Sequence, residues 1–125
     1  MVNFILILVL GATPEKIVWG AAPAPSLMTQ IDTEQDATIY LRKEKTKYVE
    51  RVEYYYKNNK LFKVKLTPYK ENKKLFEQRM HEKYPTWFER IGDVRFVKWD
   101  QEHYFIENVK IMEEMRSCAN GKCKK

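Results

Sequence analysis

Two runs of alternating apolar and polar residues lie between positions 48 and 66, and they constrain the fold more than any other feature of the chain. The first runs from Tyr48 to Tyr56 and the second from Leu61 to Leu66, with Lys57-Asn58-Asn59-Lys60 between them. Alternation with a period of two is typical of a β-strand that buries one face. The segment predicts an antiparallel hairpin whose first strand turns its even positions to the core and its odd positions to solvent.

The register of this hairpin follows from matching faces, because directly opposed residues point to the same side of a sheet. Apolar partners meet in the pairs Tyr56 with Phe62, Tyr54 with Val64, and Val52 with Leu66. The same register sets Glu53 opposite Lys65, a charge pair worth roughly 0.2–1 kcal/mol. It predicts a three-residue loop at positions 58–60. A two-residue loop would set Tyr54 opposite Lys63 and bury a charge.

The second half of the chain alternates between helical and extended patterns. Phe76, Met80 and Tyr84 recur every four residues, which predicts a helix over residues 70–83 that ends before Pro85. Residues 94–99 predict a third strand, and residues 103–106 predict a fourth strand or a helix start. The spacing of Val109, Met112 and Met115 predicts a second helix after residue 108. The expected fold class is α+β, with a small antiparallel sheet and one or two helices packed on one face.

At 125 residues, the chain is expected to form one folded domain with flanking segments. These are an apolar segment at 1–22, a Pro-rich extended arm at 23–38, the α+β domain at 39–117 and a basic tail with a cysteine pair at 118–125. The alternating prolines of Ala-Pro-Ala-Pro favour an extended linker or an arm that reaches a partner.

The apolar run at residues 2–12 has two interpretations. It is too short for a membrane-spanning helix, which needs about 20 apolar residues. It fits the core of a signal peptide, with cleavage near Gly20 or Ala22, although the segment before it holds no Lys or Arg. The alternative is a buried strand, since short β-rich apolar runs are also typical of those. The sequence therefore predicts either a secreted protein or an intracellular or virion-associated one.

The charge of the chain is unevenly distributed. The net charge is +6, and residues 42–74 hold twelve Lys or Arg against four Glu. Such an excess favours an acidic partner, although a lysine-covered solvated strand face has the same composition. The residues predicted to form a partner-binding basic face are Arg42, Lys43, Lys45, Lys47, Arg51, Tyr55, Lys63 and Lys65. An acidic protein surface is the expected partner, and nucleic acid is an alternative because aromatics interleave with the cations.

The two cysteines, Cys118 and Cys123, bracket Asn120-Gly121 near the end of the chain. If Asn-Gly forms a type I′ turn, the cysteines become a cross-strand pair with Cα atoms about 4.5 Å apart, within disulfide range. If the second helix runs through Cys118, Gly121 is its C-terminal cap. Cys-Ala-Asn-Gly-Lys-Cys resembles the last hairpin of scorpion potassium-channel toxins over these six residues. The remaining cysteine framework of that family is absent, so no residue roles transfer.

Motifs for catalysis are missing from the sequence. His81-Glu82 and Glu102-His103 are the nearest to acid–base pairs, and adjacent helical residues such as the first pair point apart. The chain offers no Gly-rich phosphate loop, and two cysteines with two histidines make a poor metal set. The expected function is therefore a non-catalytic, exported binding protein without metal or cofactor. The alternatives are an assembly or virion-type subunit that uses its arm, and a nucleic-acid-binding module built on residues 42–66.

Overall fold

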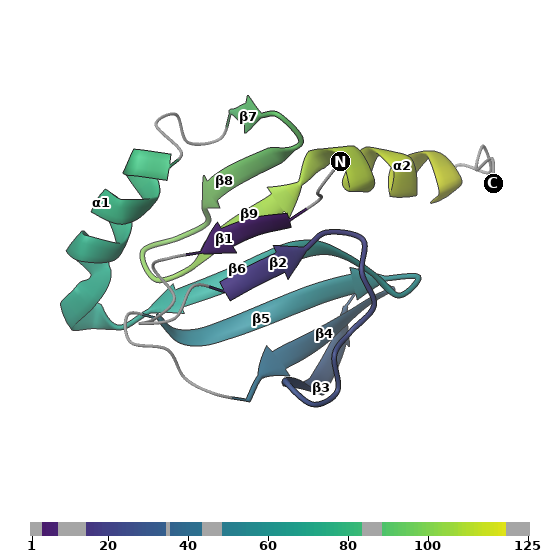
Figure 1. Cartoon of the computed structure of the whole chain (residues 1–125), viewed down its shortest axis with the longest axis horizontal. Helices are drawn as coiled ribbons and strands as arrows, with labels where there is room; N and C mark the ends of the chain where they lie inside the picture. Colours follow the sequence, from purple (N-terminus) through teal and green to yellow (C-terminus); the bar gives the residue numbers. More distant parts are fainter. Residues whose placement is uncertain (1–3, 8–14, 35, 44–48, 84–88, 120–125) are drawn as a thin grey trace.

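The structure, a computed structural model, describes residues 4–7, 15–34, 36–43, 49–83 and 89–119 (Figure 1). Within these ranges, seven antiparallel strands form one sheet in the order β3-β4-β5-β6-β9-β8-β7. They are β3 (Met28–Glu34), β4 (Ala37–Arg42), β5 (Val49–Lys57), β6 (Lys60–Pro68), β7 (Arg90–Ile91), β8 (Val94–Lys98) and β9 (Tyr104–Asn108). A separate two-stranded sheet holds β1 (Phe4–Ile7) and β2 (Glu15–Val18). The helices are the 3₁₀ turn η2 (Lys70–Asn72), α1 (Lys73–Lys83) and α2 (Val109–Ala119).

The predicted α+β class is confirmed, and so are both predicted helices and the strands at residues 94–99 and 103–106. The sheet is larger than the small one predicted, because β3, β4 and β7 extend it on both sides. None of the helices in the described part of the chain is long and apolar enough to cross a membrane.

The central hairpin, β5–β6, keeps most of its predicted register and changes at the turn. Tyr54 lies opposite Val64 and Glu53 opposite Lys65, as predicted. The turn has two residues, since Asn58 and Asn59 take left-handed φ values of 52° and 61°, as a type I′ turn requires. A β-bulge then restores the register that such a short turn would shift.

The bulge residue is Phe62, so Tyr56 pairs with Leu61 and the predicted pairing of Tyr56 with Phe62 is wrong. Phe62 turns to the opposite face of the sheet, where it packs with Tyr55. The two asparagines explain the short turn, because Asn tolerates the left-handed conformation.

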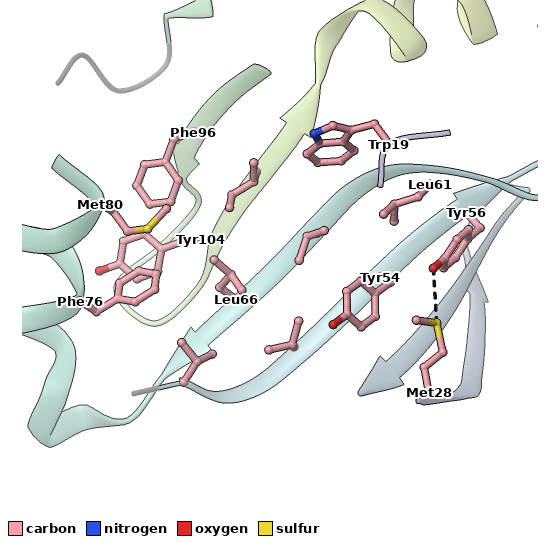
Figure 2. Close-up of a cluster of buried hydrophobic side chains, with 14 residues drawn as sticks. Trp19, Met28, Tyr54, Tyr56, Leu61, Leu66, Phe76, Met80, Phe96 and Tyr104 are labelled. Atoms are coloured by element: carbon pink, nitrogen blue, oxygen red, sulfur yellow. Dashed lines mark hydrogen bonds between the residues drawn. The ribbon is translucent and has the colours of Figure 1, made fainter. Parts of the chain in front are cut away.

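One face of the sheet carries the larger core, here called the first cluster (Figure 2). Its buried members are Trp19, Met28, Val49, Val52, Tyr54, Tyr56, Leu61, Val64, Leu66, Phe76, Met80, Phe96, Tyr104 and Ile106. Helix α1 contributes Phe76 and Met80, the two buried residues of its predicted apolar stripe. The third, Tyr84, lies outside the described residues. Helix α1 therefore covers the end of this face that holds Phe96 and Tyr104.

The opposite face carries a second cluster, so the prediction that the helices pack on one face is wrong. Its buried members are Ala37, Ile39, Tyr55, Phe62 and Phe105, and Met112 and Met115 of α2 pack against them. Tyr55 belongs to this cluster while its neighbours Tyr54 and Tyr56 belong to the first, as strand alternation requires. We call this side of the sheet the α2 face.

The start of α2 is fixed by hydrogen bonds. The buried side chain of Asn108 accepts the backbone N–H of Ile111 at 3.0 Å, which caps the helix. Arg90 donates to Glu113 at 2.9 Å and ties the β7–β8 hairpin to the helix. These contacts hold α2 against the end of the sheet (Figure 1).

The segment before β3 is part of the folded unit. Trp19 is 4% exposed in the first cluster, and Gly20 and Ala21 exchange backbone hydrogen bonds with Leu61 at 2.9 and 3.0 Å. The predicted Pro-rich arm at 23–38 instead contains β3 and the start of β4, so it belongs to the sheet. Of the β3 side chains, only Met28 is buried, which is why the strand has no alternating signal.

Candidate functional site

The α2 face carries charged side chains next to buried aromatic ones. Strand pairing sets Tyr55 opposite Lys63 and Lys63 opposite Glu107, while Lys65 lies opposite both Glu53 and Phe105. Opposed residues share a face, so all of these side chains point to the same side.

The predicted basic face is only partly assembled. Arg51, Tyr55, Lys63 and Lys65 do lie together on the α2 face. Arg42 pairs with Met28, a member of the first cluster, and so points to the other side of the sheet. Lys43 is exposed just beyond the end of β4. The last two predicted members, Lys45 and Lys47, lie outside the described residues.

Tyr55 was predicted among the exposed residues, and this is wrong because its ring is 6% exposed. It packs edge-on against Phe62 and Phe105, with ring centroids 6.4 and 6.0 Å away. Burial and the nearby carboxylate of Glu53 raise the pKa of Tyr55 to about 12. Its hydroxyl is therefore neutral at physiological pH.

Lys63 lies over this aromatic group. Its Nζ is 4.7 Å from the centroid of Tyr55 and 4.6 Å from that of Phe105. Such cation–π contacts stabilise an ammonium by roughly 0.5–2 kcal/mol. Partial burial lowers the pKa of Lys63, while the field of Glu107 opposes that change. The aromatic rings of Tyr55 and Phe105 thus hold the Lys63 ammonium over the α2 face.

The carboxylates of the α2 face lie beneath its guanidinium groups. Glu53 forms an ion pair with Arg51 at 3.2 Å, and the two side chains are 11% and 48% exposed, respectively. Glu107 accepts from Arg95 at 2.9 Å, with side chains 11% and 36% exposed. The total charge of the α2 face is thus less basic than predicted, although Arg51 and Arg95 are more exposed than the carboxylates they meet.

Trp99 lies at the margin of this face and was not singled out by the sequence. It is 68% exposed, the most exposed of the large apolar side chains in the described part of the chain. Its ring meets Phe105 edge-on at 5.9 Å, and Lys65 lies 6.0 Å from the same Phe105 ring. We call Trp99, Phe105, Lys65, Glu53 and Arg51 the Trp99 patch.

A cavity of about 370 Å³ opens between α2 and the β5–β6 end of the α2 face. Its lining residues are Glu34, Ala37, Tyr55, Lys57, Phe62, Lys63, Met112, Met115 and Arg116. The sequence indicated Met112 and Met115 only as a helical stripe, because spacing alone does not tell which surface a helix covers. The cavity therefore depends on tertiary packing.

The two candidate acid–base pairs lie in different surroundings. His81 and Glu82 are both exposed on α1. His103 instead contacts Asp100, whose carboxylate also accepts the backbone N–H groups of Glu102 and His103 at 2.8 Å. This carboxylate closes the β8–β9 turn.

Asp100 should make stability depend on acid pH. The hydrogen bond from His103, with those from the backbone, lowers the pKa of Asp100 to about 2. The unfolded value is near 3.9, so the stabilisation is present above about pH 4 and is lost as pH falls towards 2. Urea unfolding should show Asp100→Asn less stable than wild type at pH 5, with the difference shrinking by pH 2.5. The exposed Glu102→Gln control should follow wild type, and a constant difference for Asp100→Asn would contradict the assignment.

A second polar cluster joins α1 to the sheet. The Tyr104 hydroxyl donates to Glu77, which also meets Lys98 at 2.9 Å. Burial and this hydrogen bond raise the pKa of Tyr104. Partial burial acts to raise the pKa of Glu77, but the hydrogen bonds from Tyr104 and Lys98 lower it overall. The cluster anchors the helix.

Among the residues that the structure describes, no group of three or more His, Cys, Asp or Glu side chains could hold a metal ion. Helix α2 runs through Cys118 to Ala119. The backbone thus follows the helical alternative, and a strand at Cys118 is wrong. Cys123 lies outside the described residues, so the disulfide stays a prediction.

Comparison with known proteins adds no relative. No protein-family model, curated protein or solved structure matches the chain.

Proposed function

We propose that the chain is a non-catalytic binding protein that contacts an acidic protein partner through the Trp99 patch. The observation that carries the proposal is an indole 68% exposed on the same side of the sheet as Lys65 and Arg51, of which Arg51 lies over the buried carboxylate of Glu53. Trp and Arg are enriched among the side chains that dominate protein interfaces. An acidic surface laid on this patch would meet guanidinium and ammonium groups first.

The aromatic side chains of the hairpin argue for a protein partner over nucleic acid. Tyr54 and Tyr56 are buried in the first cluster, and Tyr55 is buried in the second. Stacking on unpaired bases needs several exposed rings beside the cations. Within the described hairpin, the cations of the α2 face have no such platform.

Export belongs to the proposal as well. The apolar run at residues 2–12 supports it through its length and the small residues that follow. A disulfide between Cys118 and Cys123 would accompany it, since such bonds persist in oxidising compartments.

Site-specific crosslinking tests the proposed partner. With p-benzoylphenylalanine in place of Trp99, the full chain in its native cells should form a protein adduct that resists nuclease. The same group in place of Gln78, exposed on α1 away from the patch, should not form that adduct. With the partner so identified, Trp99→Ala should weaken binding roughly thirtyfold.

Charge variants complete the test. Lys65→Gln should reduce the adduct, and added salt should do the same, because exposed charges are screened. Lys60→Gln, at the exposed hairpin turn, is the matched control and should leave it unchanged. Equal adducts at Trp99 and Gln78, or an adduct that nuclease removes, would rule out the proposed surface.

A further inference from the structure

The cavity beside α2 combines two kinds of lining. Five side chains give it an apolar wall: Ala37, Tyr55, Phe62, Met112 and Met115. Its volume of about 370 Å³ lies within the roughly 300–1,000 Å³ typical of small-molecule sites. Methionine side chains are unbranched and flexible, so the two from α2 can adapt to an apolar chain.

Charged side chains complete the lining. Lys57, Lys63 and Arg116 contribute three positive charges against one negative charge from Glu34. Among the described residues, no ion pair is formed by any of these three cations. This contrasts with Arg51 and Arg95 on the same face, which each meet a carboxylate. The cavity lining therefore has a net positive charge, although the carboxylates of Glu34 and Glu107 lie near enough to Lys63 to act on its pKa.

One of these cations has a fixed position. The contacts of Lys63 with Tyr55 and Phe105 hold its ammonium beside the apolar wall. Lys57 stands at the end of β5, next to the hairpin turn, and Arg116 in the last turns of α2. The positive charges thus come from three separate elements around one hollow.

From this arrangement we propose that the cavity binds an amphiphilic carboxylate, such as a medium-chain fatty acid. The carboxylate meets Lys57, Lys63 and Arg116, whose guanidinium can bind it with two parallel hydrogen bonds. The hydrocarbon chain lies against Met112, Met115 and Phe62. This binding activity goes beyond the proposed protein contact, because the lining of the cavity and the Trp99 patch have no residue in common.

Methionine methyl resonances provide a direct test. The chain has five methionines, two of them in the cavity wall and two, Met28 and Met80, in the first cluster on the other face. With methyl-¹³C methionine in the full chain, decanoate below its micelle concentration should shift Met112 and Met115 saturably. Met28 and Met80 should stay in place. Methionine-to-leucine variants assign the signals.

Matched ligands separate charge from hydrophobicity. Decanol has the same chain without charge and should bind at least tenfold more weakly than decanoate. Decylamine, with the opposite charge, should not shift Met112 or Met115 at all.

Variants locate the carboxylate. Lys57→Gln and Arg116→Gln should each weaken decanoate binding by up to about fivefold, as for partly exposed ion pairs. Lys60→Gln and Arg79→Gln are matched controls, because both residues are exposed and neither lines the cavity. A folded variant is recognised by unchanged Met28 and Met80 signals.

Three results would overturn the proposal. They are decanol binding as tightly as decanoate, equal shifts at Met28 and Met80, and no shift at Met112 and Met115. None of them bears on the crosslinking at Trp99, so the two proposals fail separately.

Discussion

Replacing Trp19 with alanine should lower the free energy of unfolding by about 3–5 kcal/mol, the range for large aromatic side chains removed from a core. The indole is 4% exposed and belongs to the first cluster with Leu61 (Figure 2). The next two residues add hydrogen bonds to the start of β6. Urea unfolding followed by circular dichroism measures the change.

The matched control is the same substitution at Trp99. That side chain is 68% exposed, so Trp99→Ala should change the free energy of unfolding by less than about 1 kcal/mol. Equal losses for the two variants would contradict the core position of Trp19. The pair also shows that Trp99→Ala is folded when its partner binding is measured.

Trp19 also bears on the proposed export. Cleavage after Gly20 or Ala22 would remove this side chain together with β1 and β2. A chain that starts at Pro23 should therefore be at least as unstable as Trp19→Ala. The mass of the native protein shows which form exists: a loss of about twenty residues supports export, and an intact amino terminus contradicts it.

The hairpin shows how far alternation predicts a structure. Matching faces predicted three pairs correctly, because each strand keeps its period of two from residue 52 to 55 and from 63 to 66. The error arose at the turn, where a two-residue loop and a bulge at Phe62 together give the same register as a longer loop. Both solutions fit the apolar pattern, so sequence alone does not choose between them.

The candidate site was predictable only in part, since alternation assigns residues to faces without telling what covers each face. It placed Arg51, Tyr55, Lys63 and Lys65 on one face, and the strand pairing puts all four on the same side of the sheet. Alternation predicted that this face is exposed to solvent, whereas helix α2 covers one end of the face. That packing depends on the path of the chain after β9, which no local pattern encodes. The cavity and the burial of Tyr55 follow from it.

Residues 28–38, predicted as part of the arm, were misread for a related reason. An outer strand buries few side chains, and in β3 only Met28 is buried, so the sequence has no strand alternation there. Its structure comes from pairing with β4, which in turn pairs with β5. The preceding prolines favoured an extended arm, and a turn at Ala24 replaces it.

Replacing Phe76 with alanine should cost about 3–5 kcal/mol and loosen α1 from the sheet. The Phe76 ring is fully buried, with its centroid 4.8 Å from that of Tyr104 and 6.4 Å from that of Phe96 (Figure 2). Only Phe76 and Met80 are buried among the α1 side chains that the structure describes. The helix therefore depends on two apolar contacts and the hydrogen bonds of Glu77. Urea unfolding gives the loss, and helical circular dichroism before the transition shows whether α1 detaches.

Leu75→Ala is the matched control, because Leu75 is the neighbouring apolar residue and is only half-buried. It should cost about 1 kcal/mol or less. Equal losses at the two positions would mean that α1 does not dock through Phe76. With the expected difference, α1 is docked on the first cluster through Phe76, and binding surfaces are to be sought on the α2 face, where cavity and exposed indole lie.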